Sequence, residues 1–293
     1  MGRKTALLQA NMHRVHAIAS VLRRISPEAI DVIEFNDPQF KAVNMVVNAY
    51  GYKAIALVVA NALVSYRLTL TGEEYWIEFA NWFIKARPRI GKADDVLNAF
   101  SSFLSVSKGN RILRVQKLNR LKRIARVIED ILEQPDRYLD LKLLIRELAM
   151  SLKAKPFEKT IVFAAKMAYY TFKTLGYNAR LEEVTVIPVD KRIALLTVTS
   201  GLLDTDPKNI MSRYRDTAIG AWREIARLSN IPLLRLDAIV WLPARGLEKL
   251  LYMGRIEAAR DEFARKLSSF SSGLIDWQTA RDVAKQILYR LPP

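Results

Sequence analysis

Apolar residues recur at every third or fourth position along most of the chain, a spacing that places them on one face of an α-helix. Several of these stretches open with a helix-start signal. Asp37-Pro38 combines an N-cap residue with a proline at the first helical position, and Thr71-Gly72-Glu73-Glu74 has the form of a capping box. Gly51 and Gly176 follow two of the stretches, where glycine commonly ends a helix. The pattern predicts helices at 38–50, 52–67, 72–84, 94–106, 110–134, 139–153, 157–175, 190–200, 206–228, 239–242 and onward to 289.

Residues 184–189 (V-T-V-I-P-V) interrupt the helical pattern. Their β-branched side chains favour an extended backbone, but the sequence shows no second strand to pair with it. It also contains no internal repeat, no low-complexity segment and no Gly/Ser linker. The fold class is therefore predicted to be all-α, in one large domain or two closely joined subdomains. A compact chain of 293 residues buries roughly three quarters of its unfolded surface.

Composition removes several classes of chemistry. The chain has no cysteine, which excludes disulfides, iron–sulfur clusters and thiolate zinc sites. Its two histidines, His13 and His16, have no third ligand beside them, so we expect surface residues and predict neither a metal nor a cofactor. No apolar run reaches the ~18 to 20 residues of a membrane helix, and the N-terminus lacks the form of a signal peptide. We expect a soluble, cytoplasmic protein with no membrane partner.

The formal net charge is +16, with 46 Lys and Arg against 30 Asp and Glu. A field of this strength favours a polyanionic partner, above all nucleic acid, although a basic surface can also serve heat stability. Between residues 108 and 126 every charged side chain is basic. We predict that Arg111, Arg114, Lys117 and Arg120 contact the phosphates of a DNA backbone, and a solvated helix face is the alternative.

One helix and the start of another carry the residues suited to catalysis. Lys159, Phe163 and Lys166 are spaced by four and three positions in an apolar stretch, so they share a helix face. Asp190 follows the turn I-P-V and begins a later helix. A lysine is nucleophilic only when neutral, and dry surroundings or a second ammonium group favour that form. Alternatively, the two lysines and Lys173 form the wet edge of their helix.

The segment K-P-F-E-K-T-I-V-F (155–163) and the turn I-P-V-D (187–190) resemble parts of the helix-hairpin-helix DNA glycosylases, most closely the archaeal 8-oxoguanine branch (archaeal GO glycosylases). The resemblance covers residues 30–260. It implies two helical subdomains with the active site in the cleft between them. The expected division is an N-terminal basic helix or extension at 1–29, a subdomain with base-recognition residues at 30–143 and 244–293, and the hairpin subdomain with the catalytic Lys and Asp at 144–243.

This resemblance implies a bifunctional DNA repair enzyme. Lys159 would attack C1′ of a flipped-out 8-oxoguanine nucleoside, expel the base as a Schiff base forms, and nick the strand by β-elimination. Asp190 would stabilise the positive charge on the sugar. Trp76 and Phe163 would sandwich the lesion, and Asp237 would accept the N7–H that guanine lacks. The residues expected to bind substrate are Gln39, Ser65, Trp76, Phe163, Lys166, Pro188, Asp237 and Trp241.

Structural alternatives exist for several of these contacts. Trp76 and Trp241 could be core residues, Gln39 could be an exposed helix residue, and the Ser65 hydroxyl could bond back to the preceding turn.

The sequence departs from the wider superfamily at the hairpin. That motif reads L-P-G-x-G-x-K-T, whereas K-A-K-P-F-E-K-T has no glycine, and the 31 residues from Lys159 to Asp190 exceed the superfamily's usual separation. Both features are similar to the archaeal branch. Two alternative functions remain: excision of another oxidised base, and non-catalytic nucleic-acid binding by a basic helical protein. The expected partner is DNA containing 8-oxoguanine, bound by a monomer.

Overall fold

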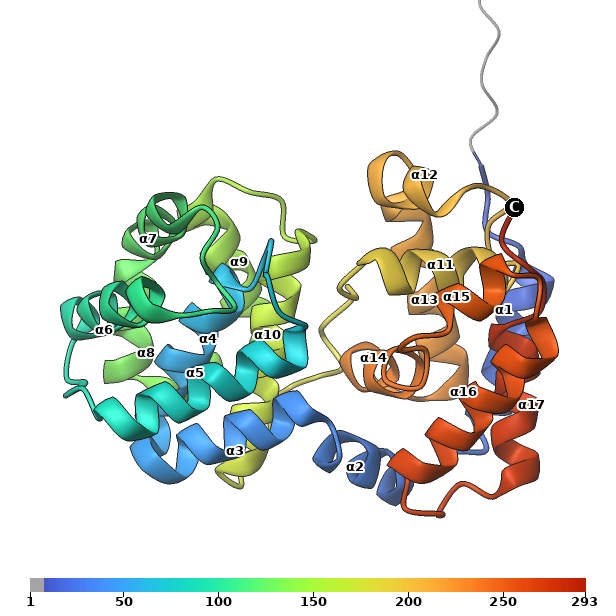
Figure 1. Ribbon diagram of the computed structural model, residues 1–293, viewed down its shortest axis with the longest axis horizontal. Coiled ribbons are helices and arrows are strands. Elements are labelled where there is room, and N and C mark those ends of the chain that lie inside the picture. The colour runs from blue at the N-terminus through green and yellow to red at the C-terminus, as the bar shows by residue number, and fades with distance from the viewer. Residues whose placement is uncertain (1–7) are drawn as a thin grey trace, which may run out of the picture. The chain divides into compact units, whose positions relative to one another are not determined.

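The computed structural model describes residues 8–293, and the regular elements in that range are all helices, as predicted (Figure 1). The described chain divides into two compact units. Unit 1 combines the residues up to Asn36 with Thr185–Pro293, and unit 2 is the continuous segment Asp37–Val184. Along the chain, unit 2 is therefore an insertion into unit 1.

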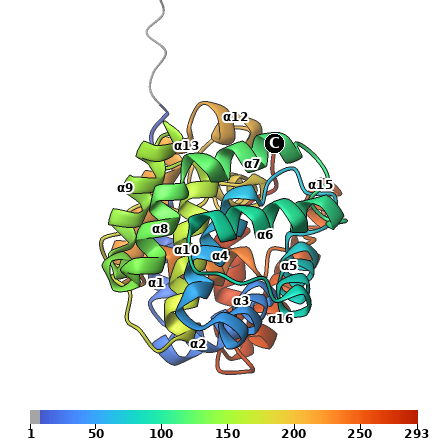
Figure 2. The ribbon, with the colours of Figure 1, turned by 90° about the vertical axis from the view of Figure 1, so that its left-hand side faces the viewer.

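Unit 2 is built around α4 (Ala54–Val64), a helix that is buried on every side. Its sequence is apolar apart from Asn61, so it has no face suited to water. Helices α3, α7, α8 and α10 pack against it (Figure 2). The other elements of unit 2 are α3 (Pro38–Tyr50), η1 (Gly51–Lys53), α5 (Gly72–Ala86), α6 (Ala93–Val106), α7 (Arg114–Arg123), α8 (Ala125–Glu133), η2 (Pro135–Leu139), α9 (Leu141–Leu152) and α10 (Lys159–Thr174).

Unit 1 assembles helices from both ends of the chain. α1 (Met12–Leu22) packs against α13 and α17, and its Val15, Ile18 and Leu22 are fully buried. The other helices of unit 1 are α2 (Pro27–Phe35), α11 (Lys191–Thr199), α12 (Pro207–Ser212), α13 (Arg215–Ser229), α14 (Leu233–Trp241), α15 (Glu248–Tyr252), α16 (Ile256–Phe270) and α17 (Trp277–Ile287).

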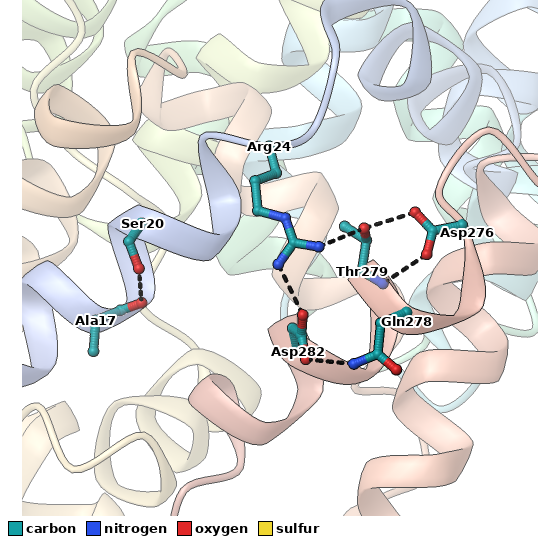
Figure 3. A network of polar contacts seen from close by, with 7 residues as sticks. All are labelled: Ala17, Ser20, Arg24, Asp276, Gln278, Thr279 and Asp282. Carbon is teal, nitrogen blue, oxygen red and sulfur yellow. Dashed lines mark hydrogen bonds and ion pairs between the residues drawn. The ribbon is translucent and has the colours of Figure 1, made fainter.

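Arg24, between α1 and α2, joins this N-terminal region to α17 (Figure 3). Its guanidinium donates hydrogen bonds to Asp282 at 2.8 Å and to Thr279 at 2.9 Å. Asp276 caps α17 by accepting the N–H of Thr279 at 2.9 Å. Residues 8–29 thus contain a helix, α1, that is an integral part of unit 1. Residues 1–7 of the expected extension lie outside the described range.

The predicted helix starts are confirmed where a cap was recognised in the sequence. Asp37 caps α3, the Thr71–Glu74 capping box forms at the start of α5, and Asp190 caps α11. The segment 184–189 contains no strand, as expected.

Two predicted helices are each divided into two. The helix predicted over 110–134 breaks at Ile124 (φ −99°, ψ 11°), whose N–H bonds to Leu121 O in a tighter turn. The break allows Ile124 to be fully buried, so packing overrides helix continuity. The helix predicted over 206–228 ends at Arg213, and α13 begins after Tyr214.

The compact units are divided at other positions than the expected subdomains. The chain crosses between units after residues 36 and 184, so 244–293 belongs with 185–243 and not with 37–143. Lys159 lies in unit 2 and Asp190 in unit 1, instead of sharing one hairpin subdomain. The reason is packing: the helices after residue 185 form one core with α1 and α2.

The helical stretch Pro38–Val64 is long and apolar enough to cross a membrane by length and composition. Its α4 portion is entirely buried in unit 2, so the structure explains this composition as that of a core helix. His13 and His16, expected at the surface, are both exposed on α1.

Candidate active site

The proposed nucleophile, Lys159, is the first residue of α10. The N-cap, Glu158, makes no side-chain hydrogen bond to this helix end. Lys159 is exposed, whereas Lys166, two turns further along the same face, is only 1 % exposed and lies 5.5 Å from the Tyr170 ring centre. The expectation of dry surroundings therefore holds for Lys166 and not for Lys159 in this structure. Bound DNA would have to exclude water from Lys159.

The two aromatic residues expected to sandwich the base are in direct contact. Trp76 on α5 is 1 % exposed, and its ring centre lies 5.8 Å from that of Phe163 on α10, at an interplanar angle of 85°. A base stacked between two parallel rings needs them about 7 Å apart, twice the usual carbon–carbon contact distance. The rings must therefore turn and separate before they can hold a base as predicted.

Gln39 lies at the start of α3 and is 4 % exposed, so the alternative of an exposed helix residue is wrong. Its backbone N–H donates to Asp37 Oδ1 at 2.8 Å, and Asp37 Oδ2 accepts a bond from the Tyr170 hydroxyl at 3.1 Å. These bonds connect α3 to α10. The helix that carries Gln39 is thereby fixed to the helix that carries Lys159 and Lys166.

The Ser65 hydroxyl bonds back to the preceding helical turn, as the alternative to substrate binding predicted. Its hydroxyl donates to Asn61 O at 2.7 Å, four residues back along α4. Beneath it lies a buried polar network, in which the Tyr75 hydroxyl donates to Asn61 Oδ1 at 2.5 Å and Asn110 Nδ2 donates to the Tyr75 oxygen at 2.9 Å. Ser65 can still accept a hydrogen bond from a substrate, but its proton is already used.

The Asp190 carboxylate is held by three N–H groups of unit 1. Oδ1 accepts the backbone N–H groups of Arg192 and Ile193, both at 2.9 Å, and Oδ2 accepts the indole N–H of Trp241 at 2.9 Å. A carboxylate offers about four lone-pair positions, so one position on Oδ2 remains. That oxygen can accept a proton from a lysine or face a positive charge on a sugar.

Trp241 is thus engaged with Asp190 in addition to lying one turn from Asp237 on α14. The guanidinium carbon of Arg192 is 3.8 Å from the Trp241 ring centre, and Arg192 also donates to Trp241 O at 3.1 Å. Asp237 is 3 % exposed, and Pro188 is buried in the turn before Asp190. Arg192 was not predicted as a site residue, although its position two residues after the N-cap brings its backbone N–H to the Asp190 carboxylate.

Of the four predicted phosphate contacts, only Arg111 and Arg114 are exposed. Lys117 is completely buried, bonds to Asn110 Oδ1 and lies 4.9 Å from the Tyr66 ring centre, so it is not available to a DNA backbone. This corrects its predicted role. Burial lowers the pKa of Lys117 to about 8. Arg120 is half-buried and donates to Thr160 Oγ1 at 2.7 Å.

The predicted site residues therefore form two groups. Unit 2 contains Gln39, Ser65, Trp76, Lys159, Phe163 and Lys166, and unit 1 contains Pro188, Asp190, Asp237 and Trp241. The pairing of Lys159 with Asp190 joins the two groups and stays a prediction.

Comparison with known protein families shows to which family the chain belongs. The model of the AGOG family, described as N-glycosylase/DNA lyase, matches residues 19–277. The chain belongs to the AGOG family. This confirms the resemblance and the expected class of enzyme, an N-glycosylase that also acts as a DNA lyase.

AGOG relatives are similar over most of their length. The N-glycosylase/DNA lyase of Methanopyrus kandleri is 35% identical over 230 residues, which are 77% of this chain and 88% of the relative. That of Aeropyrum pernix is 33% identical, over 78% of this chain and 82% of its own. A solved AGOG structure from Pyrobaculum aerophilum, an 8-oxoguanine DNA glycosylase complexed with 8-oxoguanosine, matches with a TM-score of 0.71 and 30% identity, covering 89% of this chain and 97% of that one.

Proposed function

We propose that this chain excises 8-oxoguanine from DNA and then cuts the strand at the resulting abasic site. The observation that supports 8-oxoguanine as the substrate is the similarity, over nearly the whole of both chains, to a protein solved with 8-oxoguanosine. The residues expected to bind the lesion are present at Gln39, Trp76, Phe163, Asp237 and Trp241. We further propose that the protein works as a monomer inside the cell, on chromosomal DNA.

The chemistry is proposed to begin at Lys159. Its neutral amine attacks C1′, the bond from C1′ to N9 breaks, and the departing base takes up a proton. The amine proton passes to the remaining lone-pair position of Asp190. The sugar ring then opens to an imine as O4′ is protonated. Loss of a proton from C2′ expels the 3′ phosphate, which cuts the strand.

Borohydride trapping tests this assignment directly, because borohydride reduces the imine to a stable protein–DNA bond. The parent protein should form a trapped adduct with a duplex that carries one 8-oxoguanine. Lys159→Gln should form none, whereas Lys285→Gln, an exposed lysine on α17, should trap like the parent. Equal trapping by Lys159→Gln and the parent would overturn the assignment.

A panel of lesions separates the alternatives. Duplexes with 8-oxoguanine, an oxidised pyrimidine or no lesion are incubated with the protein and run on a denaturing gel. We expect cleavage of the first alone. Preferential cleavage at the pyrimidine would indicate another substrate, and binding without cleavage would indicate a non-catalytic protein.

A further inference from the structure

A cavity of about 630 Å³ lies in unit 2, and none of the residues assigned to base recognition lines it. Small-ligand sites span roughly 300–1,000 Å³, so a nucleotide fits this volume. Three arginines line the wall: Arg114, Arg120 and Arg123. The ring of Tyr66, the amide of Asn119 and several apolar side chains complete it. This cavity is called the arginine pocket below.

Among the residues that the structure describes, no carboxylate forms an ion pair with Arg114, Arg120 or Arg123. Within residues 8–293, Arg114 donates to the carbonyl oxygen of Ser101 at 3.2 Å and Arg120 donates to Thr160 Oγ1 at 2.7 Å, and neither acceptor is charged. The Nε–H of Arg120 is buried and has no acceptor in the same range. A buried donor without a partner and crowded guanidinium groups both favour an anion from outside the protein.

Electrostatics support the same conclusion. Burial lowers the pKa of the Arg120 guanidinium; the nearby Tyr66 hydroxyl and Glu158 carboxylate oppose this effect, and the Arg123 guanidinium adds to it. A phosphate beside Arg120 and Arg123 would offset both the burial and the repulsion.

The arginine pocket is connected to the proposed nucleophile through Arg120. Its partner Thr160 is the residue directly after Lys159, at the start of α10. That end of the helix has no side-chain cap, so its N–H groups and the positive end of the helix dipole also favour an anion. A DNA strand whose sugar lies at Lys159 therefore continues past a series of anion-binding groups.

We propose that the arginine pocket binds a nucleotide next to the lesion on the same DNA strand, with its phosphate on the arginines and its base against Tyr66. Guanidinium groups suit phosphate because two parallel N–H donors match two of its oxygens. Stacking on an aromatic ring accepts any base, so this pocket adds affinity without reading sequence. The inference rests on the proposed action on DNA.

The proposed contact between the phosphate and the arginines is tested by the affinity for a duplex with a non-cleavable abasic analogue. Fluorescence anisotropy measures this affinity. Arg123→Gln and Arg114→Gln should each weaken binding about tenfold or more, as expected for loss of a charged hydrogen bond. Arg146→Gln removes the same charge from the exposed side of α9 in the same unit and should change the affinity less than twofold. Equal losses in all three variants would overturn the inference.

The proposed stacking of a base on Tyr66 is tested with two labelled single strands of equal length. One strand is made of thymidylate, and the other is made of abasic units with the same phosphates. Tyr66→Leu should weaken binding of the first about fivefold or more and leave the second unchanged. Circular dichroism checks that the variant is folded. Equal affinity of the parent for both strands would show that phosphate alone is bound and would overturn the inference.

These measurements use DNA without 8-oxoguanine and require no catalysis. Failure of the proposed function would appear as a parent protein that binds but neither cleaves nor traps. Failure of the arginine-pocket proposal would appear as a parent protein that cleaves, while Arg114→Gln, Arg123→Gln and Tyr66→Leu bind DNA with the parent's affinity.

Discussion

Single side chains define what Asp190 can do. Its carboxylate faces three N–H donors, two from the backbone of α11 and one from Trp241, and this arrangement leaves one oxygen lone-pair position unused. The backbone bonds belong to the helix cap, and the indole bond aims the second oxygen. Asp190 therefore combines a structural task with a chemical one, and substitutions can separate the two.

Asp190→Asn should retain much of the cap but lose the negative charge, so single-turnover excision of 8-oxoguanine should slow by about 10² or more. Trp241→Phe removes the aiming hydrogen bond and shrinks the ring beside Arg192 but keeps the Asp190 charge, so it should slow excision less than Asp190→Asn does. Rapid-quench gels measure both rates, and thermal unfolding verifies that the variants are folded. A Trp241→Phe protein as slow as Asp190→Asn would show that Trp241 has a larger part than aiming.

The lowered pKa of Lys117 predicts that the free energy of unfolding depends on pH. Its folded pKa of about 8 is below the ordinary value of 10.5 because burial disfavours the ammonium group. Between these values the unfolded chain binds the proton more tightly, so the contribution of Lys117 to the free energy of unfolding increases from pH 8 to 10.5 and is lost as pH falls through 8.

Lys117→Met should lack this increase, whereas Lys122→Met, at an exposed position of α7, should retain it. Urea unfolding at pH 7.5, 9 and 10 provides the comparison. Parallel pH profiles for the parent and Lys117→Met would contradict the assignment.

The connection between α6 and α7 illustrates how helices are joined around the site. Glu78 on α5 accepts hydrogen bonds from the Ser107 hydroxyl at 2.9 Å, the Gly109 N–H at 2.9 Å and the Lys108 N–H. An added Cβ at Gly109 would lie 2.8 Å from Glu78 Oε2 and 3.1 Å from the Tyr75 ring. This loop is thus packed so closely against α5 that only glycine fits.

Gly109→Ala should lower the free energy of unfolding by about 1–3 kcal/mol, because the alanine must displace the Glu78 carboxylate. Gly220→Ala is the matched comparison: it lies inside α13 with no atom within 4 Å of an added Cβ, and it should gain about 1 kcal/mol from helix propensity. Calorimetric scans of both variants measure the shifts. A Gly109→Ala protein as stable as the parent would show that the loop can yield.

Helix starts could be predicted from the sequence because their signals are local. Asp37, Thr71 and Asp190 each cap a helix through their own side chain. The breaks at Ile124 and Tyr214 could not be predicted, since no proline or glycine occurs there and only the fold shows that Ile124 is fully buried. For the same reason the charge pattern predicted four phosphate contacts, but only the fold shows that Lys117 faces inward.

The 293-residue sequence carries a net charge of +16, and this affects DNA binding over a longer range than any one contact. Each phosphate contact releases counterions, so affinity should depend steeply on salt. For six to ten contacts, affinity for undamaged duplex should fall about 10³-fold or more between 50 and 200 mM salt. Anisotropy titrations at three salt concentrations provide the slope, and a flat profile would contradict electrostatic binding.

The order of the chain has a consequence for its synthesis. Unit 2 is a continuous stretch, 37–184, whereas unit 1 needs α1 and α2 together with helices that follow residue 185. On the ribosome, the inserted unit is complete while the earlier N-terminal helices still lack their partners. Nascent α1, with Val15, Ile18 and Leu22 uncovered, must wait for the last helix, α17, before its apolar face is sheltered from water.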